Sequence, residues 1–154
     1  MSECILHTDG GSRGNPGPSG CGFVLERDDE QLLCAGCYLG VGTNNQAEYS
    51  ALIWGLQNAL KKGIKHIKVY ADSELVVKQI KGEYKVKNAN IKSLFYSVTA
   101  LIAHFDSFEI SHVFRNDNTN ADLMANKAMD AKSYVGNFIV PFNVADGSFQ
   151  NSLF

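Results

Sequence analysis

The sequence predicts a single α/β domain. Three strand-like runs come first, and helix-like and strand-like segments then alternate to about residue 132. The chain has 154 residues, 45% of them hydrophobic, which is enough for one core. No repeat, low-complexity run or linker divides it. We therefore expect one domain at residues 1–132 and a tail at 133–154 that packs on the domain or is partly disordered.

The net charge, the apolar runs and the cysteine spacing of the chain argue against several classes of protein. Net charge is −2, so any nucleic-acid binding must come from a local basic patch. No apolar run is long enough to span a bilayer, and the first residues lack the pattern of a signal peptide. Cys34 and Cys37 have C-x-x-C spacing without a second such pair, so buried reduced thiols are favoured over a metal or redox site. A cytoplasmic location is expected from this.

The first element is an apolar run that ends in a carboxylate. Residues 5–9 predict a strand that ends at Asp9, and the glycine- and proline-rich residues 12–18 predict a loop. Residues 20–26 and 31–39 predict two antiparallel strands joined by a polar turn. Asp9 is costly at a strand end unless a metal ion, a basic side chain or water lies against it.

Three more carboxylates occupy similar positions. Glu48 lies on the core-facing side of a helix that starts at residues 43–46 and ends near residue 62, before Gly63. Asp72 follows a strand at residues 66–71, and Ser73 can cap the next helix. A helix at residues 90–104, a strand at 107–114 and a polar loop at 115–120 follow. Asp122 lies in the first turn of a last helix at residues 121–132.

These four carboxylates could converge on one point. Each alone has a structural explanation, since an acid can cap a turn or favour a helix N-terminus. Together in a half-buried site they would repel one another unless cations neutralised them. Oxygen ligands select hard cations such as Mg²⁺ or Mn²⁺, and four carboxylates can hold two ions about 4 Å apart for phosphoryl displacement.

Positive charge is concentrated between residues 61 and 92. Residues 78–92 alone contain five lysines, Lys85 and Lys87 among them. Such a segment can be a solvated surface or a contact with a phosphate backbone, and both interpretations stay open.

Five motifs together resemble type 1 ribonuclease H over residues 4 to about 131. In order, they are Thr8-Asp9-Gly10-Gly11, Gly14-Asn15-Pro16-Gly17-Pro18, Thr43-Asn44-Asn45-Gln46-Ala47-Glu48, Ala71-Asp72-Ser73 and Asn120-Ala121-Asp122-Leu123-Met124-Ala125-Asn126. The resemblance implies a five-stranded mixed sheet, with three antiparallel strands, two strands parallel to the first, and helices on both faces. It also implies Mg²⁺-dependent cleavage of the RNA strand of RNA–DNA hybrids, which leaves 5′-phosphate and 3′-hydroxyl ends.

The resemblance also implies roles for single residues. Asp9, Glu48, Asp72 and Asp122 would hold two Mg²⁺ ions, which Mn²⁺ could replace. Other residues would contact the hybrid, by reading the 2′-hydroxyl or, for Thr43 and Asn45, by holding a phosphate of the DNA strand. The candidate contacts are Gly10, Gly11, Arg13, Asn15, Thr43, Asn44, Asn45, Lys85 and Lys87. No membrane or protein partner is implied, and a monomer is expected.

Three departures from the family pattern matter. The best-known bacterial members carry a catalytic histidine in the loop before the last carboxylate. This loop looks more like that of the archaeal-type subgroup, so Arg115 is the candidate for product release or phosphate contact, and His112 is expected to be structural. The stretch between the helix after Asp72 and the helix at residues 90–104 is short, so the extended basic segment that other family members carry there, called the handle, is missing. Glu74 stands where some members have a substrate-contacting glutamine, and an acid is a poorer neighbour for a phosphate than an amide is.

Two other functions compete with the hybrid nuclease. A non-catalytic nucleic-acid-binding module of the same fold should have lost at least one carboxylate, and all four are present. A DNA-cutting integrase or an exonuclease would usually lack the Asn-Pro-Gly loop and the paired asparagines at 44 and 45.

Overall fold

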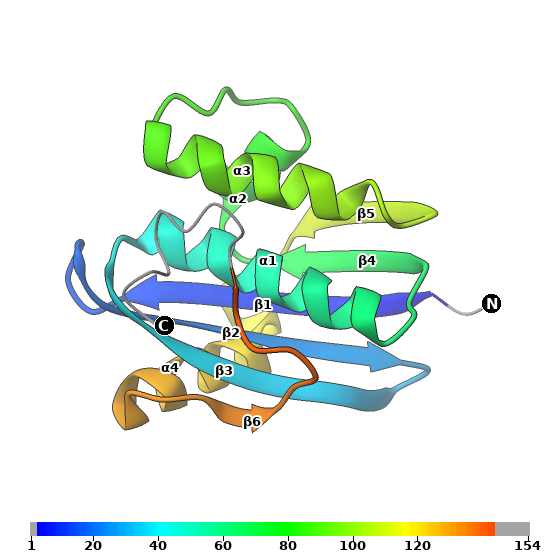
Figure 1. The fold of residues 1–154 in the computed structure, drawn as a ribbon, viewed down its shortest axis with the longest axis horizontal. Coiled ribbons are helices and arrows are strands. Elements are labelled where there is room, and N and C mark those ends of the chain that lie inside the picture. Colours follow the sequence, from blue (N-terminus) through cyan, green and yellow to red (C-terminus); the bar gives the residue numbers. More distant parts are fainter. Residues whose placement is uncertain (1–2, 144–154) are drawn as a thin grey trace.

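A mixed sheet with the strand order β5-β4-β1-β2-β3-β6 forms the centre of the fold (Figure 1). The computed structural model describes residues 3–143. The antiparallel strands are β1 (Cys4–Ser12), β2 (Gly17–Arg27), β3 (Glu30–Gly42) and β6 (Val135–Asn137). The strands β4 (His66–Ala71) and β5 (Ser107–His112) run parallel to β1. The predicted five-stranded topology is confirmed, and β6 is a short sixth strand that the sequence did not predict.

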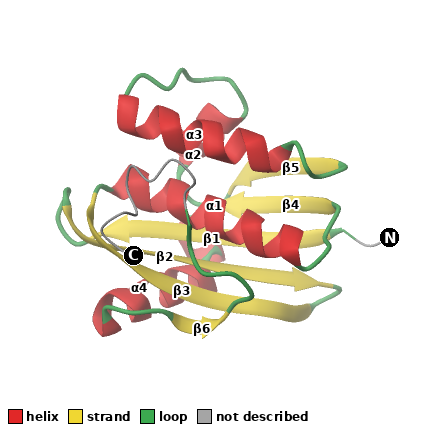
Figure 2. Cartoon of the chain, viewed as in Figure 1, coloured by secondary structure: helices red, strands yellow, loops and turns green. Residues whose placement is uncertain are grey.

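Helices cover both faces of the sheet, as predicted (Figure 2). On one face, α1 (Asn44–Lys61) lies over β1 and β2 and packs against α3 (Ala89–Ile102), while α2 (Glu74–Ile80) packs near β5. On the other face, α4 (Thr119–Ala131) lies over β2 and β3, after the short 3₁₀ helix η1 (Arg115–Asp117). No helix within residues 3–143 combines the length and the hydropathy needed to cross a membrane.

The predicted end of the first strand is wrong. β1 continues beyond Asp9 to Ser12, and β2 starts at Gly17, so the loop between them is shorter than expected. Gly10 remains in the strand because its missing side chain leaves room for α1. A Cβ there would lie 2.2 Å from the carbonyl oxygen of Ala47. Asp9 is thus inside β1, one residue beyond the last residue that pairs with β4.

Local capping signals set the helix starts. The Thr43 side chain accepts from the Gln46 N–H, and the Gln46 side chain accepts from the Thr43 N–H, which forms a capping box at the start of α1. Gly63, with φ of 85°, follows the end of the helix as expected. The Ser73 hydroxyl accepts from the Val76 N–H and caps α2. These three sequence predictions are confirmed.

The segment after α4 lies across α1 (Figure 1). Trp54 Nε1 donates to the Val140 carbonyl at 2.7 Å, and the buried Asn58 Oδ1 accepts from the N–H groups of Ile139 and Val140 at 2.7 and 3.1 Å. Phe142 is fully buried. Residues 144–154, the remainder of the predicted tail, lie outside the described residues.

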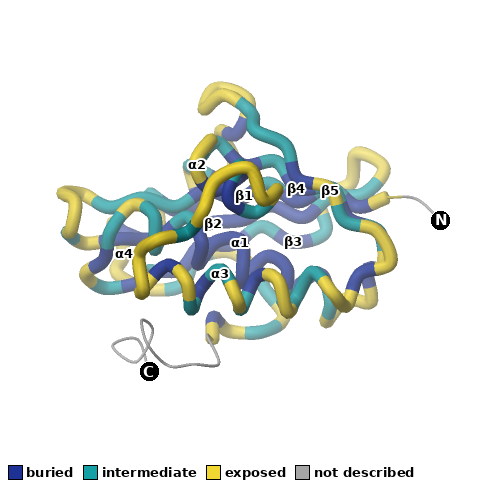
Figure 3. The backbone as a smooth tube through the Cα atoms, turned by 90° about the horizontal axis from the view of Figure 1, so that it is seen from above, coloured by how far each residue is buried: buried dark blue, intermediate teal, exposed yellow. Residues whose placement is uncertain are grey.

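The core lies between α1 and the sheet, as the buried colouring of these elements shows (Figure 3). Cys21 and Cys37 face each other across β2 and β3 in this core. All four cysteines are free, and Cys4, Cys21 and Cys37 are buried as predicted, whereas Cys34 is only half-buried.

Candidate active site

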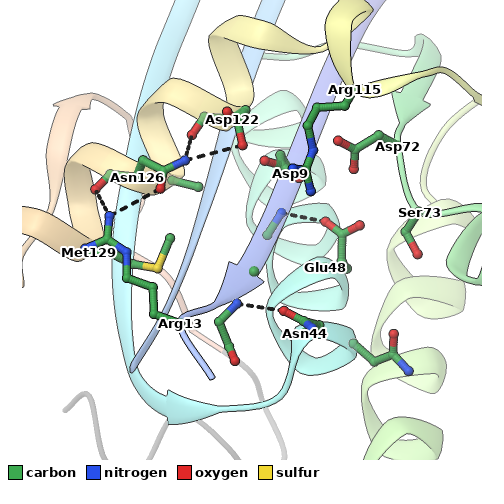
Figure 4. Close-up of a pocket in the computed structure, with 15 residues that line it drawn as sticks. Asp9, Arg13, Asn44, Glu48, Asp72, Ser73, Arg115, Asp122, Asn126 and Met129 are labelled. Carbon is green, nitrogen blue, oxygen red and sulfur yellow. Dashed lines mark hydrogen bonds between the residues drawn. The ribbon is translucent and has the colours of Figure 1, made fainter. Parts of the chain in front are cut away.

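Three of the four predicted carboxylates form one cluster. Asp9 comes from β1, Glu48 from α1 and Asp72 from the residue that follows β4. One oxygen of each lies within 4.8 Å of the others. Figure 4 shows these side chains around a single cavity of about 440 Å³.

The local structure explains why these side chains meet. Because β1 and β4 are adjacent and parallel, Asp9 and Asp72 lie beside each other at the same end of the sheet. Glu48 Oε1 accepts a 2.5 Å hydrogen bond from the Gly10 N–H, which holds the glutamate over β1. The side chain of Glu48 therefore lies on the sheet-facing side of α1, as its spacing in the sequence predicted.

Ionisation of Asp9 and Glu48 in this cluster is disfavoured by burial and by the closeness of the acids to one another. Burial raises the pKa of Asp9, and the nearby charges of Glu48 and Asp72 raise it further. Burial and the charge of Asp72 also raise the pKa of Glu48, against the effect of the Gly10 hydrogen bond. Within residues 3–143, no lysine or arginine forms an ion pair with these three acids.

One oxygen of the cluster also lacks a partner. Oδ2 of Asp72 is buried and accepts no hydrogen bond from the described residues. A cation would satisfy this atom and remove the repulsion between the acids. Since all the donor atoms are carboxylate oxygens, the cluster fits a hard divalent cation.

Asp122 takes a different position from the other three acids. It lines the same cavity from the first turn of α4 but is not part of the compact cluster. The Asn126 amide donates to its carbonyl at 3.0 Å and to its side-chain Oδ1 at 3.3 Å. Asn126 is a cavity residue for which the sequence predicted no role, although its spacing of four from Asp122 places it on the same helix face.

The predicted substrate residues fall into two adjoining groups. Gly10, Gly11, Asn44 and Asn45 line the cavity of the carboxylates. Asn15 and Thr43 line a second cavity of about 450 Å³, which shares Asn44 and Asn45 with the first. Two further amides that the sequence did not single out, Asn88 and Asn90, also line the second cavity, at the start of α3.

Hydrogen bonds tie the loop after β1 to α1. The Ser12 N–H donates to Asn44 Oδ1 at 2.8 Å, and the Asn44 N–H donates to Asn15 Oδ1 at 3.1 Å. Asn15 and Asn44 therefore hold the edge between the two cavities. Part of their hydrogen-bonding capacity is already used within the protein.

The two arginines of the carboxylate cavity differ in their partners. The Arg13 guanidinium forms an ion pair with Asp130 at 2.8 Å and a hydrogen bond with Asn126 Oδ1 at 3.2 Å, so it is held against α4. Arg115 lines the cavity from η1, and its side chain points toward Asp9 in Figure 4. His112 is in β5, with its ring 5.5 Å from that of Phe114, and does not line this cavity.

The two lysines predicted as substrate contacts lie away from both cavities. Lys85 and Lys87 are exposed in the segment between α2 and α3.

Fold and site together define a ribonuclease H-like domain with an acidic metal-binding cluster. The family model described as "Reverse transcriptase-like" matches residues 7–128. The chain is 41% identical to ribonuclease HI of Halobacterium salinarum over 123 residues, 79% of this chain and 62% of that protein. The chain belongs to the type 1 ribonuclease H family.

Two further comparisons agree with this membership. The chain is 43% identical to a bifunctional protein of Mycobacterium tuberculosis over 84% of its own length and 36% of that protein. It thus spans about a third of the mycobacterial relative and less than two thirds of the halobacterial one. The structure resembles the crystal structure of LC11-RNase H1 in complex with an RNA/DNA hybrid, with a TM-score of 0.80 and 37% identity, covering 84% of this chain and 98% of that one.

Proposed function

We propose that this chain is an endonuclease that hydrolyses the RNA strand of RNA–DNA hybrids and leaves 5′-phosphate and 3′-hydroxyl ends. The observation that carries the proposal is the convergence of Asp9, Glu48 and Asp72 within 4.8 Å, with no ion pair to a lysine or arginine among residues 3–143. The hybrid bound to a relative of the same fold supports this choice of substrate.

Asp9, Glu48 and Asp72 would hold the metal ions, with Asp122 as a further ligand at the α4 side of the cavity. We propose two Mg²⁺ ions, which Mn²⁺ could replace. Bound Mg²⁺ supplies charge that favours ionisation of water and stabilises the leaving 3′-oxygen. The protein's own contribution is to hold the carboxylates in place through β1, α1 and the end of β4 before substrate arrives.

Selection of RNA would rest on the amide groups beside the carboxylates. The Asn44 and Asn45 side chains and the backbone at Gly10 and Gly11 are near enough to the acids to contact a ribose adjacent to the cleaved phosphate. Such groups can bond to a 2′-hydroxyl, which is absent from DNA. A wholly DNA duplex would leave them unpaired.

The second cavity would hold a phosphate of the DNA strand. The starts of α1 and α3 both border it, through Thr43 and Asn88, the N-cap residues of these helices. Helix N-termini favour anions, and Asn15 and Asn90 add amide groups. Arg115 would contact a phosphate of the RNA strand, while Lys85 and Lys87 would contact the backbone farther along the duplex.

We also propose that residues 1–132 carry the catalytic machinery and that the chain acts as a monomer. A cytoplasmic location is part of the proposal, supported by the four unpaired thiols.

The test uses three end-labelled duplexes, RNA–DNA, RNA–RNA and DNA–DNA, each with Mg²⁺, with Mn²⁺ and with EDTA. We expect cleavage of the RNA strand of the hybrid, which EDTA and the Asp72→Asn substitution abolish. Asp106→Asn, at an exposed carboxylate after α3, is the matched control. Salt-sensitive binding without cleavage under any metal condition would favour the non-catalytic binding module instead, and cleavage of DNA–DNA would favour an integrase-like enzyme.

A further inference from the structure

Asn118 has an unusual placement for the N-cap residue of a helix. It precedes α4 and is 2% exposed, but its side chain makes no capping hydrogen bond. An asparagine at this position normally accepts from an N–H of the first turn, which stabilises the helix. Here the side-chain amide Nδ2 instead donates to the carbonyl oxygen of Thr8 in β1 at 2.8 Å. The Asn118 side chain therefore links the start of α4 to β1, two elements that are far apart in the sequence.

The Thr8 carbonyl lies where the sheet stops providing partners. The parallel pairing of β1 with β4 ends at Thr8 and Ala71. The chain after Ala71 leaves the sheet, because Ser73 caps α2. A buried carbonyl without a donor is costly, and the Asn118 amide supplies the missing donor. Thr8 is followed directly by Asp9, so this hydrogen bond holds the backbone that carries the central carboxylate.

The backbone of Asn118 makes the complementary contact with α4. Its carbonyl oxygen accepts from the Asp122 N–H at 3.2 Å, which is the hydrogen bond that begins the helix. One residue thus joins the peptide before Asp9 to the turn that carries Asp122. These two acids come from β1 and α4, and both line the same cavity.

The other end of the Asn118 side chain is unconstrained by the protein. Its Oδ1 is buried and has no hydrogen-bond partner within the described residues. Asn118 as a whole lines a small cavity of about 110 Å³, together with His7 and Glu26. The Thr8 hydrogen bond is therefore the contact that orients the amide.

We propose that Asn118 is a positioning residue that sets the separation of Asp9 and Asp122, and thereby the geometry of the metal site. The inference rests on the proposed function for its effect on cleavage. Asn118 itself does not line the cavity of the carboxylates, and it contacts that cavity only through its hydrogen bond to the backbone of Asp122. Loss of the Thr8 hydrogen bond should let the first turn of α4 shift relative to β1.

Two substitutions separate geometry from charge. Asn118→Ala removes the amide. Asn118→Asp keeps its size and, at a pH where the introduced carboxyl is ionised, replaces the donor with an acceptor, so Thr8 then loses its partner in both variants. The added negative charge of Asn118→Asp would by itself strengthen cation binding. Weaker binding in both variants would therefore identify geometry as the cause. Asn120→Ala is the control, because Asn120 is exposed in the same first turn and also lines the small cavity.

The first measurement is calorimetric titration of each protein with Mn²⁺ without nucleic acid, and the second is kcat and KM for the hybrid across a Mg²⁺ titration. We expect both Asn118 variants to bind Mn²⁺ about tenfold more weakly or worse, since outer-shell substitutions commonly cost about 10–100-fold. We also expect kcat to fall while KM for the hybrid stays within about twofold, as for loss of an interaction that acts in the transition state. Asn120→Ala should match the wild-type chain.

Other outcomes would overturn the inference. The first is an unchanged Mn²⁺ affinity and kcat in folded Asn118→Asp, and the second is tighter Mn²⁺ binding in that variant. The third is loss of the fold in both variants, which would show that Asn118 contributes to stability and not to the geometry of the metal site. If the wild-type chain cleaves no hybrid, the proposed function fails, whereas the Mn²⁺ titration still tests Asn118.

Discussion

The Gly10 N–H and the Glu48 carboxylate are joined by a 2.5 Å hydrogen bond between β1 and α1. This contact requires the helix to lie unusually near the strand. A Cβ at residue 10 would lie 2.2 Å from the Ala47 carbonyl oxygen and 2.6 Å from the Glu48 nitrogen. The glycine therefore permits the approach that puts Glu48 beside Asp9.

Gly10→Ala should separate α1 from β1 and displace Glu48. We expect a loss of about 1–3 kcal/mol in the free energy of unfolding, as in other overpacked sites, together with loss of hybrid cleavage. Urea unfolding measures the first effect. Gly11→Ala is the control for stability, since a Cβ there meets only Asn44 Oδ1 at 3.8 Å. Equal stability of the two variants would contradict the packing argument.

The stability of the metal-free protein should depend on pH through Asp9 and Glu48. Burial, with the nearby acidic charges, raises the pKa of both groups in the folded state. From an unfolded value of about 4 up to the raised folded values, the folded chain binds more protons than the unfolded chain. The free energy of unfolding contributed by these groups therefore falls as pH rises through this window. We expect Mg²⁺ to raise the melting temperature more at pH 8 than at pH 5.

Asp9→Asn isolates this effect from the other titrating groups. With EDTA at pH 8, the variant should melt at a higher temperature than the wild-type chain, because its folding no longer requires protonation of a buried carboxyl at this position. The difference should shrink toward pH 5, and Mg²⁺ should stabilise the variant less. A variant that is less stable than wild type at pH 8 would show that repulsion does not dominate the cluster.

Arg115 and His112 should differ in their effects on cleavage. Arg115 lines the carboxylate cavity, whereas His112 contacts Phe114 and does not line it. We expect Arg115→Ala to reduce kcat by about 10²-fold, the usual effect of removing one group that stabilises transition-state charge. His112→Ala should stay within about threefold of wild type. Single-turnover cleavage separates chemistry from product release, and a large loss in His112→Ala would reverse the assignment.

The exposed lysines after α2 should affect affinity more than chemistry. Lys85→Ala and Lys87→Ala should weaken hybrid binding and each reduce the salt-dependence slope by about 1, with kcat unchanged at saturating hybrid. Lys62→Ala is the matched control at the far end of α1 from Asn44, about 27 Å along the helix. Fluorescence anisotropy at several salt concentrations provides the measurement, and equal slopes for all three variants would place the duplex elsewhere.

The segment that crosses α1 should contribute strongly to stability. Asn58→Ala leaves the N–H groups of Ile139 and Val140 without their acceptor, so we expect a loss of about 2–4 kcal/mol. Gln57→Ala, which removes one hydrogen bond to Asn143 at the surface, should cost less than about 1 kcal/mol. The fluorescence of Trp54, the one tryptophan of the chain, follows unfolding directly. Similar losses in both variants would show that the segment is weakly held.

Local signals in the sequence were sufficient for most elements. Thr43, Gly63 and Ser73 marked helix ends correctly because caps depend on a few neighbouring residues. Period-two alternation likewise located β4 at residues 66–71. The positions of Glu48 and Asp72 followed from the same signals, since each lies at a predictable place on its own helix or strand.

Predictions were wrong where a distant element overrides a local preference. Glycines usually weaken strands, but Gly10 and Gly11 stay in β1 because β2 pairs with them and α1 packs against the first of them. The strand β6 was missed because Val135–Asn137 is too short for any periodicity and is held by pairing with β3.

The partners of single polar side chains were beyond reach of the sequence. Arg13 pairs with Asp130, and Asn118 bonds to Thr8 across a separation of 110 residues. Nothing near Asn118 distinguishes a helix cap from a link to β1, since both use the same amide. Only the order of strands in the sheet, with α4 packed over it, brings that amide to an unpaired carbonyl. Types of element and candidate acids are local properties of a chain, whereas the geometry of the site depends on contacts that exist only after folding.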